Sequence, residues 1–457
     1  MTAGKTTRPS TPWLSGAVTK SSLREQVDAG RITKIILALP DIQGRLKGKT
    51  FSAPVFLDRI ADGTDEVEMC SYLLATDTDM TPLEGFDLTG WTQGFGDLRV
   101  KPDLTIARVL PTRLGTAIMF GAPVQHDGTP LQMDPRHMLN TQLERMRDLG
   151  HNVRVGVETE FLLLTNSDSG PVPAWSDNLD YALNLPPAAT SFARHLSSAL
   201  ADAGIDYEAF KTEGAPGQAE VTFPYGDALN ACDNYAVFQL LARDVAGHDG
   251  LRTAFMAAPQ TGTGSGLHLH LSLWTEHGNP GFHHSRAQGP PPLMTHAIAG
   301  LLSLLPHLAP LYWPTANSYK RLRPHSFAPT RYNWGIDHRG CAVRVTGHGR
   351  GARLEVRLAG SDANIYLTLA AYIAAMAHGI EEKLTPRQAC EGDAYQDTST
   401  MPVHADLADA LRHFEHSTIA HNQLGKDIVT HYARAAHAEL DWHRSRVTDT
   451  EQQRGIR

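Results

Sequence analysis

The segment 153–164, which reads VRVGVETEFLLL, places two carboxylates where they could act together. Side chains alternate between the two faces of a β-strand, so Glu158 and Glu160 share one face. At the rise of a strand, these residues lie about 6–7 Å apart. Two like charges at that spacing are unfavourable unless the face is solvated, a proton is shared or a cation lies between them. Taken alone, the segment is compatible with an ordinary solvated face or with a cation site.

Further segments repeat this alternation and put acidic, basic or imidazole side chains on the polar face. In GLHLHLSLW, leucines occupy one face and His268, His270 and Ser272 occupy the other. A merely solvated face would carry an ordinary mixture of Lys, Ser, Thr and Gln, whereas these faces carry mainly Glu, His and Arg. Each strand alone suggests a solvated face, but together they predict one shared cavity. The segments GQAEVTF, CAVRV and RLEVRL contribute Glu220, Arg344, Arg353, Glu355 and Arg357.

The side chains of this cavity indicate phosphoryl transfer assisted by metal ions. Oxygen-rich ligands suit Mg²⁺ or Mn²⁺ rather than zinc, and enough carboxylates are present for two such cations. Arginine matches planar oxyanions through paired hydrogen bonds better than lysine does. Together, metal ions and arginines neutralise the charge on a transferring phosphoryl group. We expect the cation ligands to be Glu158, Glu160, Glu213, Glu220, Glu355 and His268, and the arginines to be Arg321, Arg339, Arg344, Arg353 and Arg357.

The elements that must position these residues predict an α+β protein. A first unit at 21–125 begins with a short helix, an apolar strand (KIILALPD) and a Gly-rich turn (IQGRLKGK). A clear helix follows and ends at Gly150, and the remainder of 126–457 alternates short strands with amphipathic helices. We expect residues 1–20 to be a flexible tail.

Composition indicates an ordinary globular protein large enough for two domains. The chain has 457 residues, of which 41% are hydrophobic and 20% charged. A net charge of -8 with scattered basic residues argues against nucleic-acid binding. The most apolar segment is interrupted by Pro306, His307 and Pro310, so we expect a buried helix and no membrane partner.

The cysteines and the N-terminal residues favour a cytoplasmic protein. Cys70, Cys232, Cys341 and Cys390 have no C-x-x-C spacing, which suggests neither a zinc knuckle nor a disulfide framework. The first 20 residues have no uninterrupted apolar stretch of the kind found in signal peptides. A reducing compartment fits both observations.

Several motifs together resemble the glutamine synthetases over nearly the whole chain. There is no P-loop and no dinucleotide-binding glycine motif, so the nucleotide must be held in another way. VETEF resembles the Glu-x-Glu-Phe strand of that family, EGAPGQAEV its E-x-A-P-G-Q-x-E segment, and GTGSGLHLHLSL its G-S-G-x-H-x-H-x-S-L segment. NSYKRLRP and WGIDHRGCAVRV resemble its substrate-binding and phosphate-binding arginine segments. RLEVRLAGSDANIYL resembles the last metal-binding strand, with Ile365 in place of the usual Pro.

The resemblance implies an N-terminal β-grasp-like domain and a C-terminal catalytic domain whose antiparallel sheet forms an open barrel. It also implies ATP as co-substrate, at least two divalent cations per active site, γ-glutamyl phosphate as an intermediate, and a dodecamer of two six-membered rings with active sites between subunits. One metal would be held by Glu160, Glu213 and Glu220, and the other by Glu158, His268 and Glu355. Glutamate would be bound by Arg321, Arg357 and the backbone at Gly264, and the phosphoryl group by Arg339 and Arg344. Around ATP would lie Glu208, Tyr225, His270, Ser272, Arg344 and Arg353.

Two departures from that family concern the acceptor of the glutamyl group. Glutamine-forming members carry an Asp-Gly-Ser-Ser segment whose Asp binds and deprotonates ammonium, but the nearest stretch here is LLATDTDMTPLEG. Either Asp77 or Asp79 could serve as the base, and we assign Asp77. A flap Glu of the family is replaced by Phe327, which cannot attract a cation by charge or accept its proton. An aromatic ring could instead line a pocket for the carbon chain of an amine or face its cation.

Three hypotheses follow. The preferred one is an ATP-dependent ligase that joins L-glutamate to a primary amine, such as ethanolamine or a polyamine. The second is a true glutamine synthetase with an unusual ammonium site. The third is an inactive relative that senses nitrogen or acts as a scaffold, although the retention of every metal and arginine position argues against it.

Overall fold

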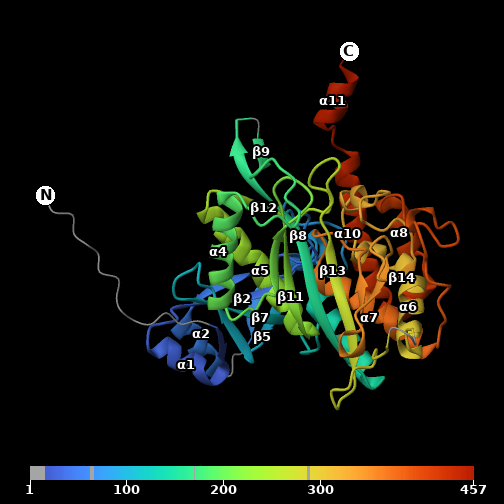
Figure 1. The fold of residues 1–457 in the computed structure, drawn as a ribbon. Coiled ribbons are helices and arrows are strands. Elements are labelled where there is room, and N and C mark those ends of the chain that lie inside the picture. Colours follow the sequence, from blue (N-terminus) through green and yellow to red (C-terminus); the bar gives the residue numbers. More distant parts are fainter. Residues whose placement is uncertain (1–15, 62–65, 169, 286–288, 457) are drawn as a thin grey trace.

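The computed structural model describes residues 16–61, 66–168, 170–285 and 289–456, and Figure 1 shows how their helices and strands are arranged. They form two sheets, one on each side of a junction between Val124 and Asn152. Helices and strands are mixed in both halves, which confirms the α+β class. Among the described helices, none combines the length and apolar character needed to cross a membrane.

The N-terminal sheet has the order β1-β6-β7-β2-β3, with β5 paired to β7 and β4 to β5. Among the strand pairs of the described residues in this sheet, β2 and β7 run parallel and the other pairs are antiparallel. We expected residues 1–20 to form a flexible tail, but the ordered structure begins before residue 21. Strand β1 pairs with β6, and α1 begins directly after β1. Residues 1–15 lie outside the described part. The elements are β1 (Ala17–Thr19), α1 (Lys20–Asp28), β2 (Lys34–Pro40), β3 (Leu46–Ser52), α2 (Ala53–Ala61), β4 (Val67–Cys70), β5 (Asp97–Pro102), β6 (Ile106–Val109) and β7 (Thr116–Val124).

The second sheet has the order β10-β11-β8-β13-β16-β15-β14, with β9 and β12 paired to β8. The expectation of an antiparallel sheet is wrong at one edge, where β14 and β15 run parallel. Within the described residues, the end strands β10 and β14 do not pair with each other, so the sheet is not a closed barrel. The strands are β8 (Asn152–Ser167), β9 (Gly170–Pro173), β10 (Ala209–Thr212), β11 (Gln218–Asp227), β12 (Arg252–Ala254), β13 (Leu267–Trp274), β14 (Trp334–Ile336), β15 (Val343–Thr346) and β16 (Arg353–Val356).

Helix α7 (Ile365–Glu381) lies almost completely buried and packs against both α3 and α6. Its close approach to α6 requires glycine, because a Cβ atom on Gly300 would overlap the α7 backbone at Ala375. The Asn364 side chain accepts hydrogen bonds from the first turn of α7 and donates to Asp41 O at 3.0 Å. The core helix is thereby tied to the N-terminal sheet. The other helices are α3 (Pro135–Asp148), α4 (Pro187–Asp202), α5 (Ala228–His248), α6 (Pro292–Leu304), α8 (Leu407–Glu415), α9 (Thr418–Leu424), α10 (Lys426–Arg444) and α11 (Asp449–Gly455).

Candidate active site

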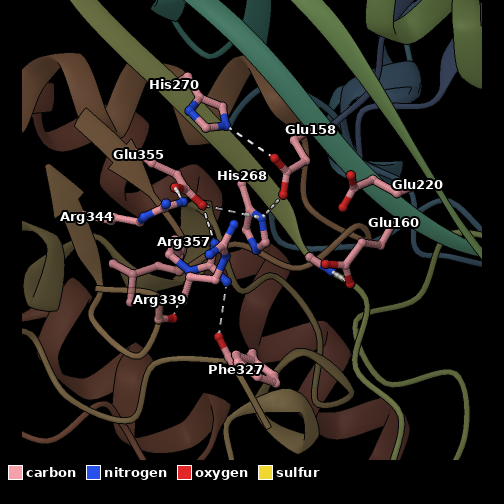
Figure 2. Close-up of polar contacts among 12 residues, drawn as sticks. Glu158, Glu160, Glu220, His268, His270, Phe327, Arg339, Arg344, Glu355 and Arg357 are labelled. Carbon is pink, nitrogen blue, oxygen red and sulfur yellow. Dashed lines mark hydrogen bonds and ion pairs between the residues drawn. The ribbon is translucent and has the colours of Figure 1, made fainter. Parts of the chain in front are cut away.

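The alternation along β8 and β13 separates an apolar face from a charged face. Val155, Val157 and Phe161 are buried in the core, as are the four leucines of β13. On the charged face, the antiparallel register puts His268 opposite Glu158 and Glu220 opposite Glu160. Strand β16 adds Glu355 opposite His270. Neighbouring strands therefore bring the charged positions of separate segments together (Figure 2).

The first group of possible metal ligands consists of Glu158, His268 and Glu355, whose ligand atoms all lie within 4.8 Å of one another. His268 Nδ1 is 2.8 Å from Glu158 Oε1 and 3.9 Å from Glu355 Oε1. His270 Nε2 approaches the other Glu158 oxygen at 3.4 Å. Both histidines thus face one carboxylate.

The second group consists of Glu160, Glu213 and Glu220, again with all ligand atoms within 4.8 Å. Gly266 N donates to Glu160 Oε2 at 2.8 Å, which fixes that carboxylate beside β13. The Lys211 ammonium pairs with Glu213 and lies 3.8 Å from Glu220 Oε2, so one positive charge offsets part of the repulsion. Even with the Lys211 ammonium beside them, three convergent carboxylates favour a further positive charge.

The pKa values of the carboxylates reflect these contacts. Burial alone would raise the pKa of Glu158, but its hydrogen bonds with His268 and His270 outweigh burial and hold that pKa well below its ordinary value. At Glu355, burial would also raise the pKa, but the positive charge of Arg357 opposes it, and the pKa falls to about 2. At Glu220, burial and the negative charge of Glu158 act in the same direction and raise the pKa to about 10. A divalent cation would relieve the cause of this last shift.

Arginines surround the first group. Arg344 donates to Glu355 Oε2 at 2.8 Å and also pairs with Asp337, while Arg357 pairs with the other Glu355 oxygen. Arg357 Nε donates to Arg339 O at 3.1 Å. Arg339 itself is exposed. The guanidinium groups of Arg344 and Arg357 thus flank one buried carboxylate.

Arg321 is buried beside the expected glutamate site. It donates to the carbonyl of Leu358 at 2.9 Å and approaches His268 Nε2 at 3.3 Å. A Cβ atom on Gly264 would come within 3.0 Å of the Arg321 side chain, so these two expected glutamate-binding residues are in contact.

Of the residues expected around ATP, His270 and Ser272 lie on β13 and Arg353 lies on the neighbouring β16. Arg353 Nε donates to His270 Nδ1 at 3.2 Å, and Ser272 Oγ accepts from Trp274 Nε1 at 2.9 Å. The exposed Tyr225 ring stacks on Trp274, with centroids 6.1 Å apart and planes at 8°. Glu208 is exposed next to β10, where its N–H donates to Thr222 O at 2.7 Å.

The sequence interpretation missed an aromatic–cation stack around Trp274. The Arg154 guanidinium lies 4.7 Å from the Trp274 ring centroid and that of Arg350 lies 5.2 Å from it. A signal was present, because Arg154 shares the polar face of Glu158 and Trp274 shares that of His268. Trp274 itself is buried, and the exposed Tyr225 ring stacked on it offers the face on which a planar ligand can stack.

Phe327 lies near the arginines but is itself 67% exposed. Its main-chain oxygen accepts from Arg357 at 3.4 Å, and its φ of 59° lies in the left-handed region. The residue borders a cavity of about 460 Å³ whose walls include His325, Arg339 and Tyr395. Figure 2 shows the ring on the side of Arg357 away from the carboxylates.

Asp77 is not brought to this site by the contacts within one chain. Its carboxylate accepts the N–H of Thr81 at 2.8 Å, and its main-chain oxygen accepts from Arg45, both in the N-terminal half. In the described part of the chain, no contact joins Asp77 to either carboxylate group. Its expected role as a base remains a prediction that requires another subunit.

Known proteins are similar to this chain over nearly its full length. A family model described as the catalytic domain of glutamine synthetase matches residues 132–454. The chain is 39% identical to a gamma-glutamylethanolamide synthetase of Streptomyces coelicolor, with 95% of each chain covered. It is 31% identical to a glutamate–isopropylamine ligase of a Pseudomonas species, covering 94% of this chain and 96% of the other. A solved structure described as a GmaS/ADP complex superposes with a TM-score of 0.82 at 27% identity, covering 95% and 98% of the two chains.

Proposed function

The chain belongs to the glutamine synthetase family, and we propose that it is an ATP-dependent ligase joining the γ-carboxylate of L-glutamate to a primary amine. One observation carries the choice of acceptor. Arg357 links Glu355 of the first carboxylate group to the main chain of Phe327. This contact supports an acceptor site beside Phe327, whose ring has no negative charge with which to attract ammonium. The full-length similarity to two enzymes named for amine acceptors supports the same choice.

Two divalent cations, Mg²⁺ or Mn²⁺, fit the two carboxylate groups. The donor atoms are carboxylate oxygens and one imidazole, and burial together with the charge of Glu158 raises the pKa of Glu220, which a bound cation would counteract. Glu160, Glu213 and Glu220 would hold one ion, and Glu158, His268 and Glu355 the other. When bound, such ions neutralise the charge of the phosphates and of the substrate carboxylate.

The chain's own residues then bind and orient the substrates. Arg321, Arg357 and the backbone at Gly264 hold glutamate, while Arg339 and Arg344 face the phosphoryl group. Around the nucleotide lie Arg353, His270, Ser272, Tyr225 and Glu208, and Tyr225 with Trp274 offers a face on which the base stacks.

The reaction proceeds in two displacements. An oxygen of the γ-carboxylate attacks the γ-phosphorus of ATP, and ADP leaves. The amine nitrogen then attacks the γ-carbonyl carbon of γ-glutamyl phosphate, and phosphate leaves with that carboxylate oxygen. The arginines act in both displacements, because negative charge accumulates on the phosphoryl oxygens in each.

The acceptor amine occupies the cavity beside Phe327. The ring contacts the carbon chain of the amine, and this binding energy positions the attacking nitrogen in place of electrostatic capture. The amine must lose a proton before attack, and Asp77 of a neighbouring subunit accepts it. This arrangement requires the assembly expected of the family, two stacked six-membered rings with active sites between subunits. We also assign the N-terminal sheet and its helices, from β1 to β7, as a β-grasp-like domain and the second sheet as an open barrel.

The test is turnover of glutamate and ATP with individual acceptors. The purified enzyme with Mg²⁺ is assayed for ADP release with ammonium, ethanolamine, putrescine, cadaverine, spermidine or spermine, and the product mass is measured. We expect a γ-glutamyl amide of at least one primary amine. Formation of glutamine alone would instead identify a glutamine synthetase, and no turnover with any acceptor would favour an inactive relative.

A further inference from the structure

Two cysteines that are far apart in the sequence meet beside a histidine at the edge of the second sheet. The ligand atoms of His338, Cys341 and Cys390 all lie within 4.8 Å of one another. Cys341 is completely buried, Cys390 is half-buried, and the two thiols interact through a hydrogen bond. None of these residues belongs to the ligand groups assigned to the ligase reaction.

The main chain holds the two cysteine segments together. Cys390 N donates to the carbonyl of Trp334 in β14 at 2.8 Å, which fixes the segment after α7 against this edge strand. Gly335 leaves the space in which the side chains meet, because a Cβ atom there would lie 3.2 Å from Cys341 Sγ and 2.8 Å from His338 Cβ. A residue with a side chain at this position would crowd both groups.

The histidine has the tautomer of a metal ligand. His338 Nε2 lies 2.6 Å from the carbonyl of Gly392, so Nε2 carries the hydrogen and Nδ1 has the lone pair. A histidine that binds a metal usually donates its second N–H to a carbonyl or carboxylate in this way. Nδ1 now accepts the N–H of Gly340 at 3.1 Å, a neutral hydrogen bond that a metal ion can replace.

We propose that His338 Nδ1 and the sulfurs of Cys341 and Cys390 bind one thiophilic divalent metal ion of the zinc class. Thiolate and imidazole donors select such an ion over Mg²⁺, which prefers oxygen. Three protein donors leave one position of a tetrahedron for water or a small ligand. His338 and Gly392 line the cavity beside Phe327, which gives the ion and that fourth ligand a path to solvent.

A metal ion can bind here only if it displaces the protons of the thiols, which favours metals with high thiolate affinity. Burial raises the pKa of the Cys341 thiol well above its ordinary value, and burial also raises that of Cys390. The thiols are therefore protonated in the free site, and up to two protons leave when the ion binds.

The experiment uses Co²⁺ as a spectroscopic probe on the reduced full-length enzyme in excess Mg²⁺. Magnesium occupies the oxygen-rich groups, and only a cobalt ion bound by thiolate gives a sulfur-to-cobalt charge-transfer band. We expect one equivalent of Co²⁺ to produce this band and an equivalent of Zn²⁺ to remove it. The band should be lost in Cys390→Ser and weakened in His338→Asn, whereas the matched control Cys70→Ser, which removes another half-buried thiol, should keep it.

Three results would overturn the proposal. One is the absence of the band in the reduced wild-type enzyme. Another is a full-strength band in Cys390→Ser. The third is a mass lower by two hydrogens with Cys341 and Cys390 found in one disulfide-linked peptide pair from freshly prepared enzyme, which would make the pair a disulfide and not a metal site. Because the band requires neither ATP nor glutamate, it is independent of the proposed ligase activity.

Discussion

Replacement of Glu220 with Gln should stabilise the metal-free protein and remove most of its stabilisation by divalent metal. The Glu220 side chain lies within 4.8 Å of Glu160 and Glu213, and burial with the charge of Glu158 raises its pKa from 4.5 to about 10. Because this pKa is higher in the folded than in the unfolded state, the unfolded state loses the proton first. The contribution of Glu220 to the free energy of unfolding is therefore fully present below pH 4.5 and is lost as the pH rises toward 10.

The size of the effect follows from the same shift. A pH of 7.5 is about 3 units above the pKa of Glu220 in the unfolded state, and each unit corresponds to about 1.4 kcal/mol. The stability lost through this group is therefore at most about 4 kcal/mol. Glutamine has nearly the same shape and cannot ionise, so the variant should regain about 2–4 kcal/mol of unfolding free energy in the absence of metal. It also lacks one negative ligand, and its metal affinity should fall.

The assay is denaturant unfolding of wild type and variant in EDTA and in saturating Mg²⁺ or Mn²⁺ at pH 7.5. We expect the variant to be more stable than wild type in EDTA but to gain much less from metal. Glu144→Gln is the matched control, because Glu144 is an exposed carboxylate on α3 whose side chain is 70% accessible. Equal metal stabilisation in wild type and Glu220→Gln would refute the assignment of Glu220 as a ligand.

Three other predictions concern the acceptor, the chemistry and the fold. Phe327→Glu should lower kcat/KM for an alkylamine relative to ammonium, because it replaces an apolar contact with a charge; an unchanged ratio would remove Phe327 from the acceptor pocket. With ¹⁸O in the γ-carboxylate of glutamate, one label should appear in the released phosphate by mass spectrometry, and unlabelled phosphate would exclude γ-glutamyl phosphate. Burial lowers the pKa of His431 from 6.5 to about 4, while its Nε2 lies 2.9 Å from Leu74 O. The unfolded state therefore binds the proton first, and about 3 kcal/mol of stability should be lost as the pH falls from 6.5 to 4. His431→Gln should lose this acid dependence in unfolding curves measured across that range. If the stability of the variant fell with pH as steeply as that of wild type, the lowered pKa of His431 would be contradicted.

The strand faces were predictable from the sequence because alternation is a local property. Glu158 and His268 each lie on the charged face that the pattern indicated, with leucine or valine on the other. Their direct pairing depends on strand register, which the resemblance to a known family supplied and the alternation could not.

Other features depended on contacts between distant segments. The Gly-rich turn after β2 was predicted too long, since Gly48 lies in β3, where it pairs with β2 at Ala38. The parallel edge strand β14 is only three residues long and has no local signature. The meeting of Cys341 with Cys390 likewise arises from the packing of the segment after α7 on this edge, and the spacing of the cysteines gave no sign of it.

The choice of acceptor is tested most directly by a competition in one tube. Glutamate and ATP at saturating concentrations are supplied to the wild-type enzyme with equimolar ammonium and ethanolamine at pH 8, and the amounts of glutamine and γ-glutamylethanolamide are measured by mass spectrometry at low conversion. Their ratio equals the ratio of kcat/KM for the two acceptors. The repeat with putrescine in place of ethanolamine covers the polyamine class. We predict that γ-glutamyl alkylamide is the main product with at least one of these amines, and glutamine as the main product in both mixtures would contradict the proposed ligase.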